Sequence, residues 1–222
     1  MKNNIVTTEV LIIGSGPGGA TVANQLSKKN IDFLIAEEGK PYKQKNKPVD
    51  TFESFFRYYQ NGGALPIFSS PIFPFASAKI FGGGSEVNGG LFWRTPDFIL
   101  NEWMRGNKIS PELYQAADKI FSKIELDLNV NSDSAKLKGN VDSQLIHDAA
   151  IKNKLMSIEV PKAIKDCQLH NRCASICTSG AKQSMTKTYL HNSNIKSLTN
   201  CKILELVFDG RKVKYALGKL DK

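Results

Sequence analysis

Residues 8–37, TEVLIIGSGPGGATVANQLSKKNIDFLIAE, decide the fold, because they hold a complete strand, turn, helix and second strand. Residues 10–13 are a short, continuous apolar run, which is typical of a parallel strand buried on both faces. The glycines that follow have G-x-G-x-x-G spacing, and they precede a helix from about Gly18 to Lys28 and a strand from Asp32 to Glu37. The stretch therefore predicts a Rossmann-like α/β fold that binds a dinucleotide, rather than a purely structural glycine turn.

Each residue of the glycine turn has a predicted role. Gly14 permits the tight turn, and Gly16 lets the backbone approach a pyrophosphate with no Cβ in the way. Gly19 lets the helix pack close against the strand. The helix begins at Pro17 and Gly18, so its N–H groups and its dipole face the phosphates.

Two acids, Glu37 and Glu38, stand where the second predicted strand ends. A carboxylate in this position binds the ribose hydroxyls of a dinucleotide. We predict Glu37 as the ribose ligand, and its neighbour Glu38 is the alternative.

Length and composition predict a globular protein of one or two domains, with 222 residues of which 41% are hydrophobic. The net charge is +9, but the basic residues are 25 Lys and only 5 Arg and are scattered, which favours a Lys-rich solvated surface over a nucleic-acid patch. Residues 1–7 are polar and no apolar run is long enough for a membrane span. We therefore expect no signal peptide and a cytoplasmic location.

A second glycine-rich segment, FGGGSEVNGGLFWRTP, occupies residues 81–96. Its five glycines, between Gly82 and Gly90, predict backbone that lies close to a large, flat or anionic group. A flexible linker is the alternative, which the apolar residues among the glycines disfavour. Ser85 could also cap a helical turn through Asn88, with N–H groups directed at the same phosphates.

The remaining elements follow from periodicity and from capping residues. The aromatic residues of a predicted helix at 50–59 are expected to pack in the core, and the Gly- and Pro-rich residues 61–75 are expected to be irregular and to serve a site or a lid. Further helices are predicted at 96–106, from Ser110 onward, at 141–155 and at 184–191, and strands at 195–198, 203–208 and 212–217. An Asp209-Gly210 turn joins the last two strands.

A cysteine-rich segment, DCQLHNRCASICTSGAKQSMTKTYL, occupies residues 166–190. Cys167, Cys173 and Cys177 have C-x5-C-x3-C spacing, and His170 lies midway between the first two. Thiolates and imidazole suit zinc or an iron–sulfur cluster, so these four residues are candidate metal ligands. The alternative is three reduced thiols on a structural loop.

The pairing of GSGPGGATVANQL with GGGSEVNGGLFWRTP, followed by an apolar segment that ends in Trp103, resembles the glucose-methanol-choline (GMC) family of flavin oxidoreductases. The resemblance favours FAD over NAD, because a nicotinamide enzyme has no evident need for the second loop. It implies that the ADP half of FAD is held by Gly14, Gly16, Gly19 and Glu37, with adenine near the backbone of Ile203. It also implies that the pyrophosphate and isoalloxazine side is lined by Gly83, Ser85, Asn88 and Gly89.

The cysteine segment resembles a branch of the same family with long-chain alcohol oxidases, cholesterol-oxidase-like enzymes and sugar dehydrogenases that pass electrons to a cytochrome. In those dehydrogenases a three-iron cluster is held by cysteines at the same spacing as Cys167, Cys173 and Cys177. Many relatives have a further cysteine where this chain has His170. The resemblance thus implies a possible iron–sulfur cluster beside FAD.

The family resemblance also implies an oxidoreductase that acts on CH–OH groups of an alcohol, sterol or sugar, with hydride transfer to flavin N5. We expect residues 1–222 to be the N-terminal portion of its FAD-binding domain, with loops and helices inserted at 40–165 and a Cys-rich loop at 166–183. No counterpart of the substrate domain or of the C-terminal catalytic histidine is found, so no catalytic residue is assigned, and we expect a truncated product or half of a split enzyme. The partners expected are an alcohol-type substrate in the complete enzyme, and a C-terminal polypeptide or an electron acceptor. Two alternatives remain: a non-catalytic flavin or iron–sulfur electron-transfer module, and an NAD(P)-binding protein.

Overall fold

The computed structural model describes residues 5–42, 50–132, 141–191 and 195–221. The chain divides into two compact units. The first contains residues 1–89, 172–180 and 184–222, and the second contains residues 90–171 and 181–183. Residues 43–49 and 133–140 of the insertion predicted at 40–165 lie outside the described residues. None of the helices among the described residues is long and apolar enough to cross a membrane.

A small parallel sheet is the centre of the first unit. Its strands are β1 (Val10–Ile13), β2 (Phe33–Ala36) and β7 (Ser197–Leu198), in the order β1-β2-β7. All four residues of β2 are buried, as expected for a central parallel strand, and this explains why its sequence is continuously apolar. The predicted strand–turn–helix–strand unit is confirmed.

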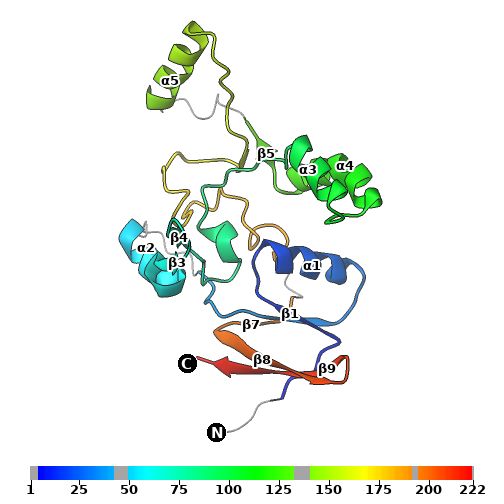
Figure 1. Cartoon of the computed structure of the whole chain (residues 1–222). Coiled ribbons are helices and arrows are strands. Elements are labelled where there is room, and N and C mark those ends of the chain that lie inside the picture. The colour runs from blue at the N-terminus through cyan, green and yellow to red at the C-terminus, as the bar shows by residue number, and fades with distance from the viewer. Residues whose placement is uncertain (1–4, 43–49, 133–140, 192–194, 222) are drawn as a thin grey trace. The chain divides into compact units, whose positions relative to one another are not determined.

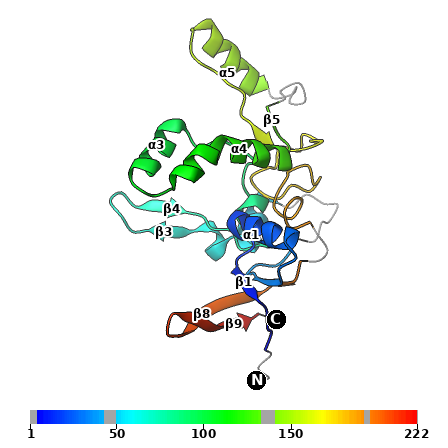
Figure 2. The same cartoon turned by 90° about the vertical axis from the view of Figure 1, so that its right-hand side faces the viewer.

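Two layers cover this sheet, as Figures 1 and 2 show from two sides. Helix α1 (Pro17–Lys28) packs on one face through Ala20 and Ala23, which are both fully buried. The antiparallel hairpin of β8 (Cys201–Asp209) and β9 (Lys212–Leu220) lies on the other side. A Cβ on Gly19 would lie 2.0 Å from the carbonyl oxygen of Gly14, so α1 approaches the strand as closely as the sequence predicts.

The stretch 61–75 is more regular than predicted. After α2 (Thr51–Tyr58) and the short 3-10 helix η1 (Gln60–Gly63), strands β3 (Leu65–Ile67) and β4 (Phe73–Phe75) form an antiparallel hairpin. Pro66 stands opposite Pro74. Proline has no N–H, so Pro66 and Pro74 must form a non-hydrogen-bonded pair, in which neither residue donates a hydrogen bond to the other strand. The prolines that argued against a strand are therefore compatible with it.

Core packing was also the wrong prediction for part of α2. Phe52 and Phe56 are 71% and 64% exposed, and their rings contact each other edge to face at 4.8 Å between centroids. The buried side of the helix is instead occupied by Ser54, which is 1% exposed. Helical periodicity shows that aromatic residues share a face, but it does not show whether another element covers that face.

The predicted helix at 184–191 is absent, since these described residues form successive turns. A small apolar cluster of Ile80, Val87 and Ile176 completes the packing of the first unit. Because Ile176 belongs to the cysteine-rich segment, part of that segment is fixed to the first unit.

The second unit contains the predicted helices. They are α3 (Asp97–Arg105), α4 (Pro111–Asp127) and α5 (Val141–Lys152), with the short pair β5 (Val130–Asn131) and β6 (Lys162–Ala163). The Ser110 hydroxyl accepts the N–H of Leu113 and caps α4 as predicted. Arg94 is bound to Glu125 of α4 by two hydrogen bonds, of 2.7 Å from Nε and 2.6 Å from Nη2.

Candidate dinucleotide-binding site

Two glycine-rich loops of the first unit touch each other at the carboxyl end of β1. The first is the turn at 14–19, and the second contains the 3-10 helix η2 (Gly83–Glu86). A Cβ on Gly83 would lie 2.5 Å from the Cα of Gly16, and Gly83 has a φ of +60°. Only glycine combines this close approach with this conformation without strain. Ligands of open α/β sheets bind at this end of the parallel strands.

The backbone beyond β2 brings the second loop to this position. Lys40 pairs with Ile80 in an isolated parallel bridge, and the N–H of Phe81 donates to the carbonyl of Lys40 at 3.1 Å. A Cβ on Gly39 would lie 2.2 Å from the nitrogen of Ile80, so the two segments pass in direct backbone contact. The segment just before η2 is thus held against the end of the sheet.

Ser15 connects both loops to the acid at the end of β2. It is fully buried, and its N–H and its Oγ both donate to Oε2 of Glu37, at 2.8 and 2.7 Å. The N–H of Gly82 donates to the same Oγ at 2.8 Å. Sequence analysis did not single out Ser15, because it occupies a variable position of the glycine motif and its partners are distant in the chain.

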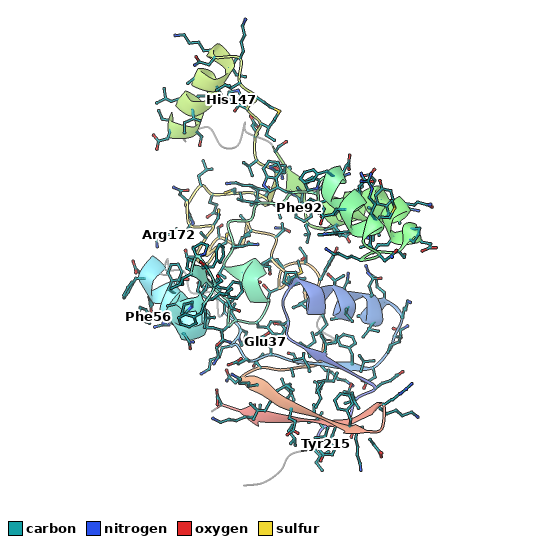
Figure 3. All side chains as sticks on the ribbon, viewed as in Figure 1. Glu37, Phe56, Phe92, His147, Arg172 and Tyr215 are labelled. Carbon is teal, nitrogen blue, oxygen red and sulfur yellow. The ribbon has the colours of Figure 1, made fainter. Side chains whose placement is uncertain are left out.

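Glu37 and Glu38 have separate surroundings. Glu37 is 7% exposed at the end of the sheet (Figure 3), and its Oε1 accepts the N–H of Gly39 at 2.7 Å. A carboxylate can accept about four hydrogen bonds, so the three donors seen here leave room for a ligand hydroxyl. Glu38 instead forms an ion pair with Lys79 at 3.0 Å. Burial raises the pKa of Glu38, but the hydrogen bonds from Lys79 and Gln60 and the charges of Lys79 and Lys202 together hold this pKa below its usual range.

The backbone of the loops has open space on one side. A Cβ on Gly14, Gly18 or Gly84 would meet no atom within 4 Å. The first N–H groups of a helix have no carbonyl partner within the helix, and those of α1 begin at Gly18. Open glycine backbone, helix N–H donors and a buried carboxylate fit the phosphates and ribose of a dinucleotide.

The structure places Ser85 inside the second loop rather than at its cap. Its Oγ donates to the carbonyl of Gly82 at 2.7 Å and accepts the N–H of Met185 at 3.0 Å. Capping of a turn through Asn88 was therefore the wrong prediction, because Ser85 lies within η2 and Gly82 precedes the helix. The hydroxyl instead fastens η2 to the segment at 185–186.

The other predicted ligands lie in two places, directly after η2 and in β8. Asn88 is exposed and Gly89 is partly buried, and both follow η2 directly. Ile203 is partly buried in β8, two positions after Cys201, whose N–H donates to the backbone carbonyl of Glu37 at 2.8 Å. The start of β8 is thus joined to the end of β2.

The candidate metal ligands are divided between the units. Cys167 and His170 belong to the second unit, and Cys173 and Cys177 belong to the first. All four lie among the described residues, and there no three His, Cys, Asp or Glu side chains are arranged to hold a metal ion.

Comparison with known proteins identifies the sequence family. The family model described as GMC oxidoreductase matches residues 55–218. An uncharacterized GMC-type oxidoreductase of Sinorhizobium fredii is 29% identical over 185 residues, which cover 83% of this chain and 36% of that protein. A long-chain-alcohol oxidase of Arabidopsis thaliana is 26% identical over 208 residues, which cover 91% of this chain and 27% of that protein.

Solved structures share the fold at low sequence identity. Pyridoxine 4-oxidase from Mesorbium loti superposes with a TM-score of 0.64 at 12% identity, over 96% of this chain and 46% of that one. A fungal aryl-alcohol oxidase gives a TM-score of 0.61 at 13% identity, over 96% and 42%. The predicted Rossmann-like FAD-binding fold is confirmed, and the chain spans between a quarter and a half of the length of these proteins.

Proposed function

The chain belongs to the GMC oxidoreductase family, and from this premise we propose that it is the FAD-binding part of an enzyme that oxidises CH–OH groups. The family is FAD-dependent, and the matched proteins named above include a long-chain-alcohol oxidase and an aryl-alcohol oxidase. The observation that carries the proposal is the junction of the two glycine loops with Ser15 and Glu37. We propose an alcohol, a sterol or a sugar as the substrate class of the complete enzyme.

The residues of the chain supply binding and orientation. The start of α1 binds the pyrophosphate through its N–H groups, and the backbone glycines let it approach. Glu37 accepts hydrogen bonds from ribose hydroxyls and is held in place by Ser15 and Gly39. The residues named here would hold FAD, which would supply a hydride acceptor at its N5 position. The cofactor ligands that we propose are Gly14, Gly16, Pro17, Gly18, Gly19, Glu37, Gly83, Ser85, Asn88, Gly89 and Ile203.

The partners of this FAD-binding part are also proposals. The matched alcohol oxidase is nearly four times as long as the matched segment, since that segment covers 27% of it. We propose that the base which takes the hydroxyl proton lies on a C-terminal polypeptide with the substrate domain, and that electrons leave to a separate acceptor. A chain that binds FAD but never turns over with such a partner would instead be a non-catalytic flavin module.

A titration distinguishes FAD from NAD(P). A Cβ on Gly18 meets no atom within 4 Å, so Gly18→Val can fold and obstructs only what binds there. Gln25→Val places the same side chain at an exposed position of the same helix and is the matched control. We expect FAD to bind more tightly than NAD or NADP, Gly18→Val to weaken FAD at least about tenfold, and Gln25→Val to leave it unchanged.

Two results would contradict the proposal. One is tighter binding of NAD or NADP, which would favour the NAD(P)-binding alternative. The other is unchanged FAD affinity in Gly18→Val, which would place the cofactor elsewhere.

The iron–sulfur proposal rests on the spacing of Cys167, Cys173 and Cys177 and on the resemblance of this segment to the cluster-binding branch of the family. We assign it no step in the reaction, because these side chains form no three-ligand group within the described part of the chain. If the cluster exists, protein purified without oxygen contains iron in proportion to the chain, and Cys173→Ser loses it. Zinc in the same proportion would indicate the four-ligand set that includes His170, and metal-free protein would leave three thiols on a loop.

A further inference from the structure

We propose that the Ser15 hydroxyl is a positioning group that couples the two halves of the FAD site. The inference rests on the proposed function and concerns how the two glycine loops act together. Ser15 is fully buried, and its hydroxyl is bonded on one side to Glu37 and on the other to Gly82. It is the shared link between the acid proposed for the ribose and the loop proposed for the flavin side.

The direction of both hydrogen bonds is fixed by chemistry. A backbone N–H only donates, so Gly82 must donate to Oγ of Ser15. The single proton of the Ser15 hydroxyl is then directed to Oε2 of Glu37, which also accepts the N–H of Ser15. One hydroxyl orientation satisfies the whole chain of bonds. Ser15 is fully buried, and hydrogen bonds from a buried donor to a carboxylate are among the stronger ones.

The second loop is held to Ser15 by the hydrogen bond from the N–H of Gly82. The carbonyl of Gly82 accepts the hydroxyl of Ser85, so η2 is tied to the residue whose N–H is bonded to Ser15. Gly83 follows Gly82, and it lies against Gly16, which follows Ser15. The hydroxyl therefore sets the spacing of the loops at the point where their backbones meet. A ligand that contacts both loops depends on this spacing, whereas one that contacts only the first loop and Glu37 does not.

Deleting the hydroxyl of Ser15 separates its effect on Glu37 from its effect on the second loop. In Ser15→Ala, Glu37 keeps two donors, the N–H groups of residue 15 and of Gly39. The N–H of Gly82 loses its acceptor in a buried position, and a buried unpaired donor is costly. We expect the second loop to relieve this by moving away from the first loop. FAD and ADP share the adenosine and the phosphates, but ADP lacks the isoalloxazine half that the second loop is proposed to line, so the binding of FAD should weaken more than the binding of ADP.

The experiment is calorimetric titration of the chain with FAD and with ADP, together with thermal unfolding of each variant without ligand. For Ser15→Ala we expect FAD binding to weaken about tenfold to a hundredfold, which is ~1.4 to ~2.7 kcal/mol, and ADP binding to weaken less than about threefold. Ser15→Cys keeps a weak donor of similar size and should be intermediate. The control is Ser54→Ala, since Ser54 is 1% exposed and its hydroxyl has no hydrogen-bond partner among the described residues. It should leave both affinities unchanged.

The outcomes are distinguishable. Wild-type chain that binds no FAD would overturn the proposed function and this inference with it. Wild-type chain that binds FAD with the affinity of Ser15→Ala would overturn the inference alone. Equal weakening of FAD and ADP would also overturn it, because a general loosening of the fold does not select the flavin half. If Ser15→Ala does not fold, the same comparison is made with Ser15→Cys, where the difference between FAD and ADP must still appear.

Discussion

Substitution of Gly83 by alanine tests whether the two glycine loops are in backbone contact. A Cβ on Gly83 would lie 2.5 Å from the Cα of Gly16 and 3.2 Å from its nitrogen. Carbon atoms prefer about 3.5 to 4.0 Å, so the loops would have to separate by about 1 Å. The φ of +60° adds a second cost, because alanine disfavours the left-handed region by ~1 kcal/mol. With ~2 kcal/mol for the overlap, the expected loss is ~3 kcal/mol.

Gly84 is a matched control in the same 3-10 helix. A Cβ there meets no atom within 4 Å, and Gly84 has no positive φ. Gly84→Ala should therefore change stability by less than about 0.5 kcal/mol. In a chain of this length ~3 kcal/mol lowers the melting temperature by roughly 6–12 °C, which thermal unfolding followed by circular dichroism resolves. If Gly83→Ala and Gly84→Ala had the same melting temperature, the contact between the loops would be refuted.

Three further predictions follow from the acids of this site and from Arg94. Glu37→Gln should weaken FAD binding about tenfold or more in a titration, because it removes the carboxylate to which Ser15 and Gly39 donate. Glu38→Gln should leave FAD binding unchanged, because Glu38 is paired with Lys79 instead. Since the fold lowers the pKa of Glu38, its contribution to stability is full above the unfolded-state pKa and is lost as the pH falls through the lowered value. Urea unfolding of wild type and Glu38→Gln should therefore differ near neutral pH and converge in acid, and a constant difference would contradict this. Arg94→Lys should lower the stability of the second unit slightly in the same assay, because lysine cannot make the paired bonds to Glu125, and an unchanged urea midpoint would contradict a stabilising role for this partly exposed pair.

Several predictions that depended on short-range patterns were confirmed, although the helix at 184–191 and the cap at Ser85 were not. The first strand, α1 and β2 are where the apolar run, the glycines and the periodicity placed them. Ser110 caps α4, and Gly106 follows the last residue of α3. Each of these signals acts within one or two turns of chain, through a hydrogen bond or a backbone conformation that the residue type itself favours.

Predictions that required knowledge of distant neighbours were less successful. Aromatic residues of α2 were expected in the core, but Phe52 and Phe56 are mostly exposed, because no described element covers that face. Residues 65–75 form a hairpin that tolerates its prolines, because Pro66 and Pro74 stand opposite each other on the paired strands. Ser85 was expected to cap a turn through Asn88, but it lies within η2, and its hydroxyl is bonded to Gly82 and to Met185, a partner 100 positions away.

The sequence by itself determined the Rossmann-like fold, the family and the glycine positions, because turns, caps and buried parallel strands impose residue types locally. Only the tertiary structure distinguished Glu37 from Glu38, since adjacent acids look alike until one is seen bonded to Ser15 and the other to Lys79. It alone identified Ser15 as the link between loops, because a hydroxyl has no pattern in the chain and acquires its role from partners that folding brings within hydrogen-bond distance. Side-chain partnership across long sequence separations is a property of packing, and packing is decided by the whole fold.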